Sequence, residues 1–137
     1  MLKLAVVTAT VNPERAYPCL KTWGVADGFV GVVNGRPWTP HEKPEEQMGD
    51  LTREWLISPE YLGSVSAFRL GMDFALKETD ADIICCLHDD VEIHDPDWVQ
   101  TVKRHFERHP ACGLAGFGGA LGLGDADIYQ KPYAPMQ

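Results

Sequence analysis

Residues 87–96 read LHDDVEIHDP and follow directly on the apolar run DIICCL at residues 82–87. The segment places His88, Asp89, Asp90 and Glu92 in close succession. Carboxylates this close repel one another unless a positive charge lies among them, so the segment predicts solvent, a helix start or a metal ion beside it. A hard cation such as Mg²⁺ prefers carboxylate and phosphate oxygens, and an imidazole ligand shifts the preference toward Mn²⁺.

The spacing of these side chains predicts which of them bind the ion. In an extended segment side chains alternate, so His88 and Asp90 are expected on one side and Asp89 on the other. Two ligands two residues apart can bind one ion, which makes Asp90 and His88 the predicted ligands of a divalent metal, Mn²⁺ or Mg²⁺. A solvated acidic loop, in which Asp95 only caps the next helix, is the alternative. The position directly after a buried strand favours binding.

Strands and helices alternate along the chain. Short apolar, β-branched runs predict strands at residues 2–9, 29–33, 54–57, 82–87 and 112–117. Helical periodicity predicts helices at residues 14–23 and 63–78 and a third that opens at Asp95-Pro96. Pro18 is tolerable only near the first turn of its helix.

The two later helices have predicted buried faces. In the helix at residues 63–78, Ser64 is the expected N-cap. Its inward face is predicted to carry Val65, Phe68, Met72, Ala75 and Leu76. The third helix is predicted to bury Trp98, Val99, Val102 and Phe106.

This alternation predicts an α/β domain with three layers, in which a mainly parallel sheet is flanked by helices. In such sheets ligands bind beyond the carboxyl ends of the strands. Polar clusters follow three predicted strands, at residues 8–12, 34–35 and 88–92. Their convergence at one edge of the sheet predicts a binding site.

Length and composition narrow the class of protein. The 137 residues are 45% hydrophobic and 23% charged, which predicts one domain over residues 1–137, with a long Pro-rich loop at 36–53 and a flexible tail at 118–137. The formal net charge of -8 argues against nucleic acid as a partner. No apolar run approaches the ~20 residues of a transmembrane segment. Four cysteines without a Cys-x-x-Cys pair predict a reducing, cytoplasmic location.

Four segments together resemble the nucleotide-binding half of GT-A fold glycosyltransferases, in particular those of glycosyltransferase family 2. They are VVTATVNPERAYPCLKTW at residues 6–23, VVNG at 32–35, YLGSVSAFRLGMDFAL at 61–76 and LHDDVEI at 87–93. The last is similar to the Asp-x-Asp turn of that family and is the specific motif. The resemblance implies a Rossmann-like domain that binds a nucleotide-sugar donor through a metal ion and transfers the sugar to an acceptor, which stays unknown.

The resemblance also implies roles for single residues. His88 stands where the family has the first Asp, and Asp90 takes the metal-binding role of the last. Asn34 replaces the acid that reads the nucleotide base and keeps a carbonyl acceptor without a charge. The predicted nucleotide-binding residues are Ala9, Thr10, Val11, Asn34, Arg69 and Asp89.

Catalytic residues stay unassigned, because family members carry the general base in an acceptor-binding half that follows the glycine-rich segment. That base is therefore expected outside this chain, which predicts a donor-binding half, with truncation as one explanation. Two alternatives remain: a nucleotide-binding or interaction module without transfer chemistry, and a small metal-dependent hydrolase that uses His88, Asp89 and Asp90.

Overall fold

The computed structural model describes residues 1–24, 26–37, 53–116, 120–122 and 134–135. Along the chain these form β1 (Leu4–Thr10), α1 (Pro13–Leu20), the 3₁₀ turn η1 (Lys21–Trp23), β2 (Gly28–Asn34), β3 (Arg53–Ser58), α3 (Ser64–Glu78), β4 (Ile83–Cys86), α4 (Trp98–Arg108), β5 (Ala120–Gly122) and β6 (Ala134–Pro135). Four of the five predicted strands and all three predicted helices are present, with ends that differ by a few residues.

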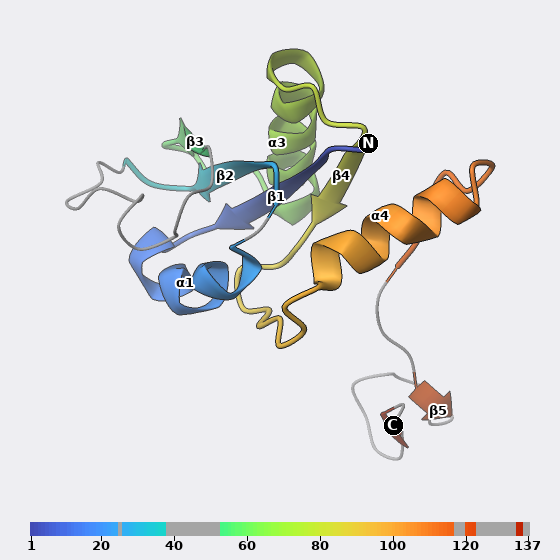
Figure 1. The fold of residues 1–137 in the computed structure, drawn as a ribbon. Coiled ribbons are helices and arrows are strands. Elements are labelled where there is room, and N and C mark those ends of the chain that lie inside the picture. The colour runs from blue at the N-terminus through green and yellow to red at the C-terminus, as the bar shows by residue number, and fades with distance from the viewer. Residues whose placement is uncertain (25, 38–52, 117–119, 123–133, 136–137) are drawn as a thin grey trace.

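Strands β1 to β4 form one parallel sheet in the order β3-β2-β1-β4. The chain passes from β1 to β2 and on to β3, then returns to place β4 on the other side of β1 (Figure 1). Val7 of β1 is thereby in register with Cys86 of β4. The predicted α/β fold with a parallel sheet is confirmed.

Helices cover both faces of this sheet (Figure 1). One face carries the main core, where buried residues of α1, η1 and α4 pack on Leu4, Val6 and Phe29. The other face is covered by α3, which packs through Ala75 on Val7 and Val30. The arrangement has the three predicted layers.

Helix α1 differs from its prediction at Pro18. The helix begins at Pro13, after the N-cap Asn12, and contains Pro18 in its interior. A proline there removes one backbone donor from the helical ladder. The α-helix ends at Leu20 and the chain continues as the 3₁₀ turn η1, so the predicted helix over 14–23 is split in two.

The predicted inward face of α3 is wrong in large part. Its buried residues are Ala67, Gly71 and Ala75, whereas Val65 is 82% and Leu76 64% exposed. The sheet accepts the helix on its small side chains, because only these allow the close approach seen at Gly71. Ser64 is also not the N-cap: Gly63, with φ 79°, takes that place without a side-chain hydrogen bond.

Helix α4 begins at Trp98, later than the Asp95-Pro96 signal predicted. The Asp95 carboxylate instead accepts a hydrogen bond from the Asp97 N–H at 2.8 Å, which forms a turn ahead of the helix. Trp98 and Val99 are buried as predicted, while Val102 and Phe106 are partly buried against the core.

The buried face of α4 also carries a charge that the pattern did not predict. Lys103 is 4% exposed, and its ammonium lies 2.6 Å from a carboxylate oxygen of Asp27. The same oxygen accepts the Leu4 N–H at 2.8 Å. Burial acts to raise the pKa of Asp27, but the hydrogen bonds from Lys103 and Leu4 outweigh it and hold the pKa below its ordinary value.

The predicted strand at 112–117 is wrong over its described part, because residues 112–116 form no strand. Short strands β5 and β6 pair with each other as an antiparallel ladder instead. The predicted loop at 36–53 and tail at 118–137 fall mostly outside the described residues. In the part of the chain that is described, no helix is long and apolar enough to cross a membrane.

Candidate functional site

The chain places β2 and β3 on one side of β1 and β4 on the other, so the strand order reverses between β1 and β4. The carboxyl ends of these two strands, here called the reversal point, are the expected position of a ligand. The buried Thr8 hydroxyl donates to the Leu87 carbonyl at 2.6 Å. The Leu87 N–H donates to the Val7 carbonyl at 3.0 Å. These two bonds fix the end of β4 to β1 immediately before His88, so the acidic segment starts at the reversal point.

The turn after β1 is organised by its own polar side chains. Thr10 is 3% exposed, and its hydroxyl accepts the Asn12 N–H at 3.1 Å. The Asn12 side chain accepts the Arg15 N–H at 3.4 Å and so caps α1. Of the predicted nucleotide-binding residues in this turn, Val11 is 57% exposed, Ala9 is partly buried and Thr10 is buried. Any ligand contact here is therefore expected from Val11 and the backbone.

The segment after β4 is a turn, which corrects the predicted alternation of side chains. The Val91 N–H donates to the His88 carbonyl at 3.2 Å, with Asp89 and Asp90 at the tip. Alternation holds only for extended backbone, so the expected pairing of His88 with Asp90 on one side does not apply. The His88 ring packs edge-on against Phe68 of α3, with centroids 5.5 Å apart.

The carboxylates of the turn act electrostatically on Cys19 of α1. Burial raises the pKa of the Cys19 thiol, and the charges of Glu92, Asp90 and Asp89 raise it further. Asp89 and Asp90 have no hydrogen bond or ion pair to another described side chain, and Asp90 is exposed. The two acids are thus without a partner among the described side chains, while the exposed His88 packs its ring against Phe68 of α3.

The donor set of the turn suits a hard ion only. Among the described residues, no three His, Cys, Asp or Glu side chains are arranged to hold a metal ion as they stand. Mg²⁺ requires only one or two protein carboxylates when phosphate and water complete its octahedron. Asp89 and Asp90 fit that requirement, and His88 is not gathered with them.

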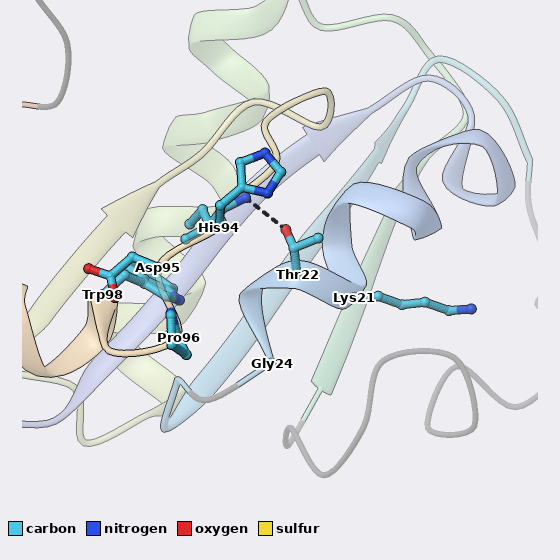
Figure 2. A pocket seen from close by; sticks show the side chains of 8 residues that line it. Lys21, Thr22, Gly24, His94, Asp95, Pro96 and Trp98 are labelled. Carbon is cyan, nitrogen blue, oxygen red and sulfur yellow. Dashed lines mark hydrogen bonds between the residues drawn. The ribbon is translucent and has the colours of Figure 1, made fainter. Parts of the chain in front are cut away.

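The backbone after the turn is held by η1, through residues that the sequence did not mark as functional. The Trp23 indole N–H donates to the Val91 carbonyl at 2.8 Å. The Ile93 N–H donates to the Thr22 hydroxyl at 2.9 Å (Figure 2). That hydroxyl donates to the Cys19 carbonyl at 2.6 Å. Trp23 is fully buried. These bonds keep the acidic turn in one position relative to α1.

A hollow of about 420 Å³ lies beside this segment rather than at the acidic turn. Its lining comes from η1 and the residue after it, the loop ahead of α4 and the first residue of α4: Lys21, Thr22, Gly24, Ile93, His94, Asp95, Pro96 and Trp98. The Lys21 side chain extends away from the other lining residues (Figure 2). The hollow contains none of the predicted site residues.

The remaining predicted residues, Asn34 and Arg69, lie apart from the turn. Asn34 is 4% exposed; its amide oxygen accepts the Leu62 N–H at 2.8 Å and its amide nitrogen donates to the Gly63 carbonyl at 3.3 Å. Through these two bonds Asn34 holds the loop between β3 and α3. Arg69 has an 83% exposed side chain, with its Nε 4.0 Å from Asp73 on the same helix.

Known proteins add no further constraint. No family model, curated protein or solved structure matches the chain. The functional argument therefore rests on the reversal point of the sheet and on the turn that it carries.

Proposed function

We propose that this chain binds a nucleoside diphosphate, the donor part of a nucleotide-sugar, through a divalent cation held by Asp90 and Asp89. It would serve as the donor-binding domain of a glycosyltransferase whose acceptor is unknown. The observation that carries the proposal is the hydrogen bond from the Thr8 hydroxyl to the Leu87 carbonyl. It holds the acidic turn, with two carboxylates that lack a protein partner among the described side chains, at the reversal point between β1 and β4. A chain with a net charge of -8 repels a diphosphate unless a cation intervenes.

Each part of the site has a defined task in this proposal. The bound cation supplies positive charge to the diphosphate as it leaves the sugar. Asp90 and Asp89 offer oxygen ligands, and the hydrogen bonds from Trp23 and Thr22 keep the turn in place. The turn at residues 10–12 offers backbone and the exposed Val11 to the nucleotide. Predicted contacts of Asn34 and Arg69 with the nucleotide remain predictions.

We expect nucleoside diphosphates to bind only in the presence of a divalent ion. Calorimetric titration with uridine and guanosine diphosphates should give an affinity at least ~10-fold higher with Mn²⁺ than in EDTA. Asp90→Asn should remove most of this gain, because the amide keeps the shape and loses the charge. Asp97→Asn is the matched control in the same segment and should bind as the wild type does. Equal affinity with and without the ion would refute the proposal.

A second measurement decides the role of His88. Because its ring packs on Phe68, His88→Asp should leave the ratio of Mn²⁺ to Mg²⁺ affinity within about twofold of the wild type. The loss of the aromatic contact should cost ~1 kcal/mol and lower the melting temperature by roughly 3–5 °C. A ratio shifted about tenfold toward Mg²⁺, at unchanged stability, would instead place His88 among the metal ligands.

Binding without transfer is the alternative that a specific observation favours. Both polar atoms of the Asn34 amide are engaged by backbone groups, so this position offers no ready base contact. Incubation with a nucleotide-sugar and Mn²⁺ distinguishes the two functions, since a donor-binding domain that activates the sugar releases nucleoside diphosphate slowly by transfer to water, and a binding module does not. A metal-dependent hydrolase receives less support, because its usual cluster of three ligands is absent from the described residues.

A further inference from the structure

The carboxyl end of α4 brings two histidines together. His105 and His109 are four residues apart on one face of the helix, and their ring centroids are 4.8 Å apart. Both side chains are exposed. The spacing alone is common on helix surfaces, and a metal site requires a further ligand from elsewhere in the chain.

The structure supplies this further ligand at Cys112. The backbone turns directly after α4, where the Cys112 N–H donates to the His109 carbonyl at 2.8 Å. The turn brings the Cys112 thiol to 3.9 Å from Nε2 of His105. Two ligands of one tetrahedral Zn²⁺, at about 2.3 Å for sulfur and about 2.1 Å for nitrogen, lie roughly 3.6 Å apart. The observed pair is within a few tenths of an ångström of that separation.

The local electrostatics also favour a cation at this position. The unpaired carbonyls at the carboxyl end of a helix carry partial negative charge and stabilise positive charge beside them. The chain as a whole carries a net charge of -8. A divalent ion bound at the end of α4 would therefore be attracted by the helix carbonyls and the net charge, against the repulsion of Arg108 in the same last turn.

We propose that His105, His109 and Cys112 bind a borderline-soft divalent ion, Zn²⁺ in the first place, with water as the fourth ligand. As they stand, the three side chains do not form a closed ligand set. Closure requires rotation of the exposed His109 side chain, which takes picoseconds to nanoseconds. It also requires the half-buried Cys112 thiol to leave the Leu114 carbonyl, to which it donates at 3.3 Å. The two nitrogens and one sulfur differ from the oxygen donors of Asp89 and Asp90, so this site and the acidic turn select different metals.

Titration of the full chain with Co²⁺, a spectroscopic substitute for Zn²⁺, tests this site. We expect one thiolate-bound cobalt ion per chain, with a thiolate-to-cobalt charge-transfer band in the near ultraviolet that added Zn²⁺ removes. Cys112→Ser should abolish the band, because sulfur is its source. His105→Ala and His109→Ala should each weaken Co²⁺ binding by about tenfold or more.

Matched variants separate this site from other cobalt-binding groups. Cys86→Ser removes another exposed thiol and should leave the band unchanged, as should Asp90→Asn in the acidic turn. His105 and His109 are exposed and Cys112 is half-buried, so far-ultraviolet circular dichroism should show that their variants remain folded. A band that persists in Cys112→Ser, or the absence of the band at about 100 µM Co²⁺, would overturn the proposal.

Discussion

Replacing Asp27 by Asn should lower the free energy of unfolding by about 3 kcal/mol, because it leaves the Lys103 ammonium buried without its counter-charge. The Lys103 side chain is 5% exposed, and its ammonium is 2.6 Å from Asp27. Asn has nearly the same shape and can still accept the Leu4 N–H. The loss therefore reports the charge alone. Urea denaturation followed by circular dichroism measures it.

The reverse change should cost much less. Lys103→Met removes the buried ammonium and keeps an apolar stem of similar length, while the Asp27 side chain that remains is 40% exposed and hydrated. We expect a loss of about 1 kcal/mol. The double variant should resemble Lys103→Met rather than the sum of both changes. Equal losses of stability from the two single variants would contradict this prediction, because they would show that the cost does not come from leaving the Lys103 ammonium buried and unpaired.

The difference between wild type and Asp27→Asn should also depend on pH. The folded-state pKa of Asp27 lies below its ordinary value, so its contribution is complete above the unfolded-state pKa of about 3.9. It is lost as the pH falls from there through the folded-state value. The difference in unfolding free energy between wild type and variant should therefore stay constant between about pH 5 and 8 and shrink in acid.

This buried pair illustrates what hydrophobic patterning omits. Lys103 occupies a helix position between Val99 and Phe106 that geometry directs inward, but a charged side chain is expected outside. Its partner Asp27 lies far away in the sequence, so no local signal announces the pair. The same limit applies to α3. Large apolar side chains were predicted on its buried face, whereas its small residues pack on the sheet. A helix that approaches a sheet closely selects small residues, and only the tertiary structure shows how close the approach is.

The candidate site could be predicted in part for similar reasons. The acidic turn follows β4 as expected. A parallel strand that is buried on both faces has a continuous apolar sequence, and the first polar residues after it mark its end. Its conformation could not be predicted, since the hydrogen bond from Val91 to His88 and the support from Trp23 depend on the packed structure. The resemblance implies that Asn34 contacts the nucleotide base, which stays a prediction; the amide bonds to backbone groups of residues 62 and 63 could not be predicted from the sequence.

The close approach of α3 to the sheet makes Gly71→Ala a destabilising change, although alanine is the better helix former. A Cβ at this position would lie 2.6 Å from a methyl carbon of Val7 and 3.2 Å from one of Val32. Both valines are fully buried in adjacent strands and have no free space to move into. Helix propensity should contribute about 1 kcal/mol, and the overpacking should cost about 3 kcal/mol. The net loss of about 2 kcal/mol is measurable by chemical denaturation.

A matched substitution and a double variant identify the cause of this loss. Ser66→Ala lies on the exposed side of the same helix and should change stability by no more than about 0.5 kcal/mol. Val7→Ala removes the methyl group that a Cβ at residue 71 would meet, and leaves a cavity that costs about 2 kcal/mol by itself. With Gly71→Ala the added methyl fills part of that cavity, so the double variant should be more stable than the sum of the single losses by at least about 1 kcal/mol. Simple additivity, or a gain in stability from Gly71→Ala alone, would contradict the close contact between α3 and β1.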